Sequence, residues 1–269
     1  MSRIFVSVSG ISNRKELEEI GKIYRNEKLK FNLAIGYQVS GKSINDGTRN
    51  PRQPFFSDLK GLCDRTLELG FIPAIHYYAK SMDWFNEDVE KIAGVIEPER
   101  ALIQFNTLPL SIEALGKVKE RGFGVIFKVA VANKKSPEGG YKVWKGEMVQ
   151  DVTNGDASLL IKQIEERKGL IDYAMFDPSH GTNLELDLSE KSLAIRFGRE
   201  LVGKERNGCI GLVYAGGIGP GNVKEVAERL NHHFPWKFSI DTESGVRTNN
   251  ELDIGLVRNY LVNYRDALK

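Results

Sequence analysis

Cysteine is scarce in this sequence, and neither sign of charge is in excess. Only Cys63 and Cys209 occur, far apart and without the spacing of metal ligands, so we interpret both as buried or half-buried thiols. Lysine and arginine together number 38 against 36 for aspartate and glutamate, which gives a formal charge of +2. This balance leaves no overall electrostatic footprint for nucleic acid or a membrane surface.

Long hydrophobic runs are also absent. No stretch reaches the ~18 apolar residues that a membrane-spanning helix needs. The opening MSRIFVSVSG lacks the charged segment and the long apolar segment of a secretory leader. We therefore expect a cytoplasmic protein whose partners include neither nucleic acid nor a membrane. The sequence leaves open whether it is a monomer or a homodimer.

Short apolar runs recur along the whole chain. They are rich in β-branched or aromatic residues and lie at 4–10, 31–39, 71–78, 101–105, 124–132, 171–177, 209–216 and 237–241. Strands that are buried on both faces of a parallel sheet have this nearly continuous apolar character.

Helix-like segments separate these strands. Val223, Val226, Ala227 and Leu230 follow the i, i+3, i+4, i+7 spacing of one apolar helix face. The other helical segments lie at about 13–28, 55–69, 84–95, 111–121, 157–167, 187–201 and 254–264. A doubly wound sheet also alternates strands with helices, but eight βα units in 269 residues favour closure into a barrel. The sequence therefore predicts an α/β fold, a single-domain (β/α)8 or TIM barrel over residues 1–269.

Two connections are longer than the usual two to six residues, at 40–54 and 133–154. Both follow the carboxyl ends of strands, and in a barrel that end carries the catalytic face. They are either lids and substrate clamps or ordinary surface insertions. The aromatic residues of YKVWKG, at 141–146, either cover a ligand or belong to a small hairpin on the rim.

Glycine gathers at the last two strand ends. In VYAGGIGPGNVKEV, at 213–226, Gly216 and Gly217 permit positive φ and a close approach of the backbone to a ligand. Ser244 and Gly245 offer a small side chain and a free amide after the eighth strand. Loops at these two junctions often bind phosphate in barrels, so we predict a phosphate site there rather than two plain turns. The stretch is no dinucleotide fingerprint, and we expect neither a cofactor nor a metal.

Several motifs, in the same order along nearly the full length, resemble those of the phosphoribosylanthranilate isomerase family. The matching stretches are SVSGIS (7–12), LIQFN (102–106), IFKVAV (126–131), MFDPSHGTNLELD (175–187), YAGGIGPGNV (214–223) and SIDTESGVR (239–247). The last two are the most specific, since the family has L-A-G-G-L-x-P-x-N-V and V-D-V-S-S-G-V-E. The resemblance implies a TIM barrel and an Amadori rearrangement in tryptophan biosynthesis.

The resemblance also implies an acid and a base. The family's acid is an aspartate after the sixth strand, which Asp177 matches, and its base is a cysteine, which Ser9 replaces. A serine hydroxyl scarcely ionises at neutral pH, so it is a far poorer base than a thiolate. His76, at the end of the third strand, and His180, three residues after Asp177, are the alternative bases, because imidazole titrates near neutrality.

Substrate-binding residues follow from the same resemblance. Gln104 and Lys128 match polar positions inside the family's barrel, and a lysine in so apolar a strand is costly unless it is paired or faces a polar centre. The family holds the anthranilate carboxylate with an arginine after the second strand, where this chain offers Arg49 and Arg52. We interpret Arg247, beside the phosphate loop, as a solvated surface charge.

Three functions remain open at this point. The first is an isomerase acting on a phosphosugar, either phosphoribosylanthranilate or a relative with a changed aglycone. The second is a lyase or epimerase for another phosphorylated substrate, using Asp177 with His76 or His180. The third is a non-catalytic protein that binds a phosphorylated metabolite. One barrel hosts many chemistries, so the fold alone does not separate them.

Overall fold

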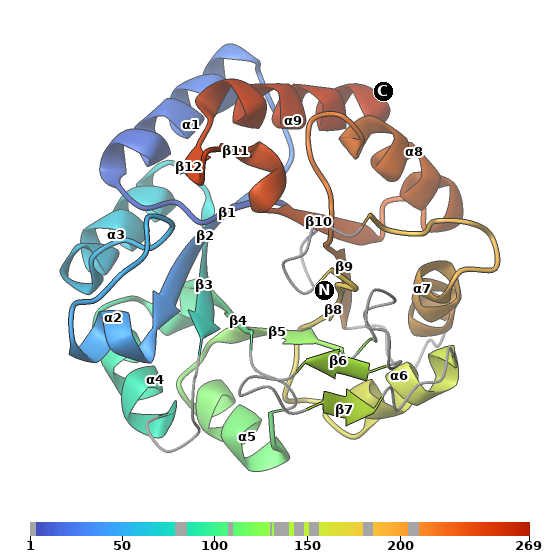
Figure 1. Cartoon of the computed structure of the whole chain (residues 1–269), viewed down its shortest axis with the longest axis horizontal. Coiled ribbons are helices and arrows are strands. Elements are labelled where there is room, and N and C mark those ends of the chain that lie inside the picture. The colour runs from blue at the N-terminus through green and yellow to red at the C-terminus, as the bar shows by residue number, and fades with distance from the viewer. Residues whose placement is uncertain are drawn as a thin grey trace.

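Eight parallel strands close into a barrel that a ring of helices surrounds (Figure 1). The structure is a computed structural model and describes residues 4–78, 85–106, 110–129, 131, 140–142, 148–150, 156–179, 185–203 and 210–269. Around the barrel the strand order is β1-β10-β9-β8-β5-β4-β3-β2. The predicted (β/α)8 fold is therefore confirmed.

All eight predicted strands belong to the barrel. Their bounds are β1 (Val6–Ser9), β2 (Leu33–Ser40), β3 (Ile72–Tyr78), β4 (Leu102–Phe105), β5 (Gly124–Lys128), β8 (Tyr173–Phe176), β9 (Gly211–Tyr214) and β10 (Phe238–Thr242). Every neighbouring pair is parallel, and β1 pairs with both β2 and β10, which leaves the ring without a free edge.

The outer ring contains α1 (Arg14–Asn26), α3 (Leu59–Glu68), α4 (Phe85–Ala93), α5 (Ile112–Glu120), α6 (Ala157–Glu165), α7 (Leu193–Gly203), α8 (Val223–His233) and α9 (Ile254–Ala267). Five of these helices begin at a side chain that accepts a backbone N–H, namely Asn13 for α1, Ser111 for α5, Asp156 for α6, Ser192 for α7 and Asp253 for α9. Helix α7 begins six residues later than the sequence pattern predicts, because 187–192 forms bends and turns.

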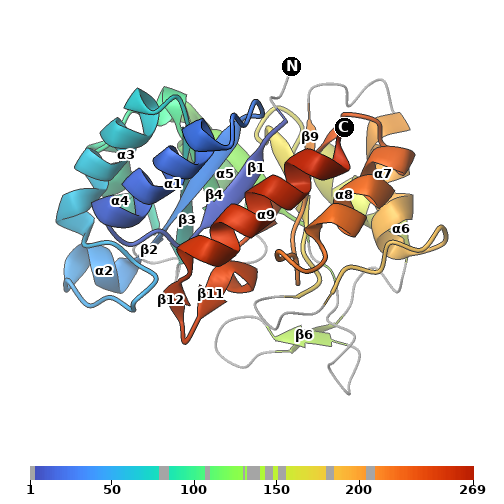
Figure 2. The ribbon, with the colours of Figure 1, turned by 90° about the horizontal axis from the view of Figure 1, so that it is seen from above.

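Shorter elements lie between these. They are α2 (Gly41–Asn45), the 3₁₀ helices η1 (Phe56–Asp58), η2 (Pro98–Arg100) and η4 (Ser244–Val246), and the antiparallel pairs β6–β7 (Gly140–Lys142 with Met148–Gln150) and β11–β12 (Arg247–Thr248 with Glu251–Leu252). In Figure 2, α2, β6 and β11–β12 lie at one end of the barrel and the carboxyl terminus at the other. Both long connections thus contribute to the end where the strands finish.

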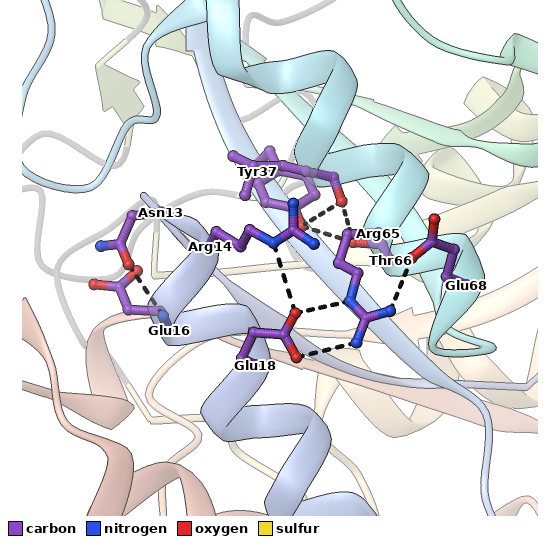
Figure 3. Close-up of polar contacts among 9 residues, drawn as sticks. Asn13, Arg14, Glu16, Glu18, Tyr37, Arg65, Thr66 and Glu68 are labelled. Carbon is purple, nitrogen blue, oxygen red and sulfur yellow. Dashed lines mark hydrogen bonds and ion pairs between the residues drawn. The ribbon is translucent and has the colours of Figure 1, made fainter.

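Two apolar layers hold the fold together. One fills the barrel, and the larger one lies between the strands and the helices. Polar contacts cross the larger layer between α1, β2 and α3 (Figure 3), where the Tyr37 hydroxyl lies 2.7 Å from Thr66 Oγ1. At its edge Arg65 binds both oxygens of Glu18, at 2.8 and 3.1 Å. No helix in the described ranges is both long and apolar enough to span a membrane.

Candidate active site

Side chains inside the barrel change from apolar to polar toward the carboxyl ends of the strands. An apolar plug formed by residues such as Ala74, Leu102, Ile126 and Met175 fills the amino-terminal half. Two residues after each of these lies a buried polar side chain: His76, Gln104 and Lys128 on β3, β4 and β5, and Asp177 directly after β8. Successive side chains in a strand point to opposite faces, so residues two positions apart point to the same face. The polar side chains therefore also point into the barrel, where they form a layer next to the apolar plug. The end of the barrel where the strands finish therefore carries the buried polar and ionisable side chains.

Ser9 is the centre of a buried hydrogen-bond network on one side of this end. Its hydroxyl donates to Asp241 Oδ1 at 2.7 Å and lies 3.4 Å from His76 Nε2 and 3.2 Å from Ser7 Oγ. Gly36 lies beside Ser9 in the neighbouring strand, and a Cβ there would come within 2.3 Å of Ser9 Oγ. The network joins β1, β3 and β10.

Lys128 and Asp177 form an ion pair on the other side. Both are buried, and the ammonium of Lys128 donates to Asp177 Oδ2. The other carboxylate oxygen accepts the Ser179 amide at 2.9 Å and the Ser179 hydroxyl at 2.7 Å. Strand β5, which carries Lys128, lies four places from β1 in the ring of eight, directly across the barrel from Ser9.

Gln104 lies between these two groups with an unused acceptor. It is level with His76 in the adjacent strand, and its amide nitrogen donates to Asn106 Oδ1 at 3.1 Å. Its amide oxygen is buried and accepts no hydrogen bond within the described ranges. Because a buried acceptor without a donor is costly, this oxygen is suited to a hydroxyl or N–H of a ligand.

The two glycine loops contact one another. Gly216 and Gly217 have φ of 108° and 60°, in the region that side chains disfavour. A Cβ on Gly245 would lie 2.2 Å from Ile218 O and 2.8 Å from Gly219 Cα, so only glycine allows this packing. The loops after β9 and β10 therefore meet in the segment that leads into α8.

Hydrogen bonds fix these loops from within. The side chain of Asn222 accepts from the Gly219 amide at 2.9 Å and donates to Gly217 O at 2.8 Å. Thr242 Oγ1 donates to Ile218 O at 2.6 Å, which ties the end of β10 to the loop after β9. A fixed backbone is what an anion site at a helix N-terminus requires.

Known proteins give one sequence match and several structural ones. No protein-family model matches the chain. N-(5'-phosphoribosyl)anthranilate isomerase of Methanococcus aeolicus is 28% identical over 124 residues, which is 46% of this chain and about half, 51%, of that protein. The solved isomerase of that name from Pyrococcus furiosus aligns with 98% of this chain and 99% of its own, at 19% identity and a TM-score of 0.60.

A second solved structure is phosphoribosyl anthranilate isomerase in complex with reduced 1-(O-carboxyphenylamino)-1-deoxyribulose 5-phosphate. The alignment with this structure covers 98% of this chain and 99% of the isomerase chain, with 15% identity and a TM-score of 0.58. The chain is similar to the phosphoribosylanthranilate isomerases. At these identities the structural matches establish the shared barrel fold.

The two arginines expected to replace the isomerases' carboxylate-binding arginine differ in surroundings. Arg52 pairs with Glu243 at 2.7 Å and donates from Nε to Asn250 at 2.7 Å, so it lies at the mouth of the barrel beside the loop after β10. Arg49 is exposed, lies 4.0 Å from the centre of the Phe55 ring and bonds within its own loop. Of the two, Arg52 is the one that contacts the loop after β10.

A cavity of about 1130 Å³ adjoins this mouth. It extends from Gln38 and Tyr78 at the strand ends, past Arg52 and Glu243, to Asp88 on α4. Burial, followed by the charges of Glu243 and Asp177, raises the pKa of Tyr78 and keeps its hydroxyl protonated. The cavity combines cations, anions and hydroxyls, so it is suited to a polar ligand group.

Arg247 does not lie free in solvent, and that sequence interpretation is wrong. Its guanidinium donates to the backbone oxygens of Ser9, at 3.4 Å, and of Gly10. Burial lowers its pKa, and a Cβ on Gly10, whose φ is 82°, would collide with the guanidinium at 2.2 Å. The arginine therefore caps the carboxyl end of β1 instead of extending into water.

Of the remaining predicted residues, His180 and Cys209 lie outside the described ranges. Cys63 is buried in α3, where burial raises the pKa of its thiol to about 12. Sequence reasoning missed Gln38 and Asp241, which complete the polar layer on β2 and β10. The alternation of inward and outward side chains along each strand could have identified both residues, since Gln38 and Asp241 each lie two residues after a position that points into the barrel. In the described part of the chain, no three acidic, histidine or cysteine side chains are grouped as metal ligands.

Proposed function

We propose that this protein is an isomerase that rearranges a phosphorylated aminosugar of the phosphoribosylanthranilate type. The observation that carries the proposal is the pairing of two proton-transfer groups across one barrel mouth. His76 with Ser9 and Asp241 occupies one side, and Lys128 with Asp177 occupies the other. An Amadori rearrangement needs one group to donate a proton and another to remove one.

The Lys128–Asp177 pair is the acid in this mechanism. It delivers a proton to the ring oxygen of the sugar while the C1–O bond breaks and its electron pair passes to that oxygen. The lone pair of the substrate nitrogen forms the C1=N bond. Ser179 holds the Asp177 carboxylate during this step through the two hydrogen bonds to Oδ1.

His76 is the base for the second step. It takes the proton from C2, the C–H electron pair forms the C1=C2 bond, and the C=N pair returns to the nitrogen. The resulting enol then tautomerises to the ketone. An imidazole performs this step far better than the hydroxyl of Ser9, which is already a donor to Asp241.

The two ends of the substrate occupy different sides of the mouth. We assign its phosphate to the loops after β9 and β10, where Gly216, Gly217 and Gly245 keep backbone amides accessible to an anion. The non-phosphorylated half enters the cavity beside β2 and β3, where Arg52 offers a cation and Tyr78 a hydroxyl. The reacting carbons then lie between Ser9 and Lys128.

The direct test is turnover of phosphoribosylanthranilate. The compound is generated in situ, and loss of its anthranilate fluorescence is followed after adding the protein. We expect wild-type turnover and a decrease in kcat of about 10²–10⁴-fold for Asp177→Asn and for His76→Gln, which is the usual contribution of acid–base groups. Absence of wild-type turnover would contradict the proposal for this substrate.

A matched control lies at the opposite end of β8. Asp172 also pairs with a lysine, Lys119, at 2.8 Å, and accepts the Val125 amide at 2.7 Å, but it precedes β8 at the amino-terminal end of the barrel. Asp172→Asn should retain kcat and lose only stability. Equal loss of activity in Asp172→Asn and Asp177→Asn would mean that any broken ion pair disables the barrel.

The same assay addresses the alternatives. If wild type is inactive but Ser9→Cys is active, the pocket fits the substrate and the natural protein is a binding protein for a phosphorylated metabolite. If both are inactive, a lyase or epimerase acting on another phosphosugar is favoured.

A further inference from the structure

We propose that Ser9 is a positioning residue that fixes the tautomer of His76, and that His76 Nδ1 is the atom that removes the substrate proton. This assignment rests on the proposed function, and it gives Ser9 a role different from that of the cysteine that the family resemblance implies at this position. In this arrangement Ser9 never loses its proton to the substrate. Its hydroxyl connects the imidazole to the carboxylate of Asp241.

The tautomer of His76 follows from counting the hydroxyl and ring hydrogens that the network has to share. Ser9 has one hydroxyl hydrogen, and the 2.7 Å contact commits it to Asp241 Oδ1. The oxygen of Ser9 can then only accept, so in the 3.4 Å contact the hydrogen must lie on His76 Nε2. A neutral imidazole carries one ring hydrogen, so Nδ1 has the free lone pair.

The second lone pair of the Ser9 oxygen also has a hydrogen-bond donor. Ser7 Oγ lies 3.2 Å from Ser9 Oγ and fills it by donating its own hydroxyl hydrogen. Ser9 thus makes three hydrogen bonds, one as donor and two as acceptor, which is the full capacity of a hydroxyl. No described residue bonds to Nδ1 of His76, so that nitrogen keeps its lone pair free of a protein donor.

Burial makes this network effective. Ser9 is 0% exposed and His76 3%, so water contributes little to their hydrogen bonding. When Nδ1 takes a proton, the positive charge stays on the imidazolium ring, and the Ser9 hydroxyl and the Asp241 carboxylate stabilise it through the hydrogen bonds of the network. No covalent bond changes in the network itself. A carboxylate connected in this way stabilises the charged ring during proton removal.

A cysteine fits this network less well than a serine. Ser9 Oγ occupies space that a side chain on Gly36 would fill, since a Cβ there would lie 2.3 Å away, and sulfur is larger than the oxygen it would replace. A thiol is also a weak donor and a weak acceptor, and it would loosen the contacts to Asp241 and His76 together. Restoring the residue of the similar isomerases should therefore lower activity.

The test reads the tautomer directly. Histidine-ring ¹⁵N NMR of the full-length protein, with His76 assigned from the spectrum of His76→Gln, should show Nε2–H in wild type. Ser9→Ala should give a mixture of both tautomers and lower kcat by about 10²–10⁴-fold, with KM changed far less, because the base is then often in the wrong form. Ser9→Cys should fall between wild type and Ser9→Ala.

Ser239→Ala is the matched control. Ser239 is 1% exposed, lies on β10 and accepts the Phe5 amide at 3.1 Å, but it contacts neither ring nor carboxylate of the network. It should lower stability and keep the Nε2–H tautomer. An Nδ1–H tautomer in wild type, or a gain in activity for Ser9→Cys, would overturn the assignment.

The two proposals fail separately. Loss of the Nε2–H tautomer in Ser9→Ala supports the positioning role of Ser9 whether or not phosphoribosylanthranilate is turned over. Absence of turnover counts against the proposed function alone. Turnover combined with an unchanged tautomer in Ser9→Ala overturns the positioning role and leaves the isomerase in place.

Discussion

At the scale of single residues, the space for Ser9 is set by a glycine on the neighbouring strand. Gly36 has an ordinary φ, so its importance comes from crowding and not from backbone conformation. A Cβ there would lie 2.3 Å from Ser9 Oγ and 2.8 Å from Ser9 Cα. Since Cα belongs to the backbone, the collision cannot be relieved by a side-chain rotation alone.

Gly36→Ala should therefore destabilise the protein and disturb the site together. We expect the free energy of unfolding to decrease by about 1–3 kcal/mol, the usual cost of overpacking a core. Activity should decrease as well, because Ser9 would be displaced from His76. Urea unfolding followed by circular dichroism, and the fluorescence assay, measure the two effects.

Gly61→Ala provides the opposite control. Gly61 lies in the interior of α3, is exposed, and a Cβ there would meet nothing within 4 Å. Alanine should raise stability by about 0.4–1 kcal/mol, because it restricts the unfolded chain and favours the helix. If the two variants changed stability equally, crowding at Gly36 would not be the cause.

At the scale of elements, the last helix depends on the residue that caps its amino terminus. Asp253 caps α9 by accepting the Leu256 amide at 3.0 Å and the Thr248 hydroxyl at 2.9 Å. These hydrogen bonds, the backbone one first, lower the pKa of Asp253 from its ordinary 3.8. A carboxyl whose pKa is lower in the folded chain stabilises the fold above its unfolded value, and this contribution is lost as the pH falls.

Asp253→Asn should separate the effect of the capping hydrogen bond on stability from the effect of the negative charge. Asparagine caps helices about as well as aspartate, so near pH 7 the variant should be nearly as stable as wild type. Below about pH 4, where the unfolded carboxyl takes up its proton, wild type should lose stability more steeply than the variant. Asp253→Ala should be less stable at both pH values. Thermal unfolding between pH 2 and pH 7 measures this, and parallel curves for wild type and Asp253→Asn would contradict it.

A second link between elements connects the 40–54 segment to the loop after β10. Arg52 and Glu243 are both less than one-third exposed, at 31% and 23%, and their ion pair is 2.7 Å long. A double-mutant cycle with Arg52→Ala and Glu243→Ala should give a coupling energy of about 1 kcal/mol, the upper part of the range for accessible pairs. Independent effects of the two substitutions would mean that the pair does not join the loops.

At the scale of the whole molecule, α9 completes the ring of helices. It packs between α8 and α1, as Figure 1 shows, and so connects the end of the chain to its beginning. Its buried face consists of Val257, Tyr260, Leu261 and Tyr264. At the α1 side, Arg258 donates to Glu27 at 2.7 Å.

Truncation after Asp253 should therefore prevent folding. Burying each of these four side chains is worth about 1.5–3 kcal/mol, which together is comparable to the roughly 5–15 kcal/mol stability of a typical domain. Near-ultraviolet circular dichroism and limited proteolysis should reveal a loosely packed chain, whereas removal of Lys269 alone should change neither. A cooperative thermal transition in the truncated protein would contradict this expectation.

The sequence by itself determined the architecture. Eight apolar runs separated by amphipathic segments leave few arrangements for burying both faces of each strand, and a closed parallel barrel is the one that fits this length. Runs such as 71–78 and 237–241 locate β3 and β10 to within one or two residues. The start of α7 was predicted six residues too early, because local hydrogen bonds of the Asp187 and Ser192 side chains hold the chain in a turn that delays the helix to Leu193.

Only the tertiary structure decided which polar residues meet. Ser9 and Asp241 are 232 positions apart in sequence and share a hydrogen bond because β1 and β10 close the barrel. The same closure turns Arg247 back onto the end of β1, where the sequence indicated a surface charge. Periodicity shows that a side chain points inward, but only the register between strands sets its partner. For this reason the identity of the fold was readable along the chain, and the Ser9 network was not.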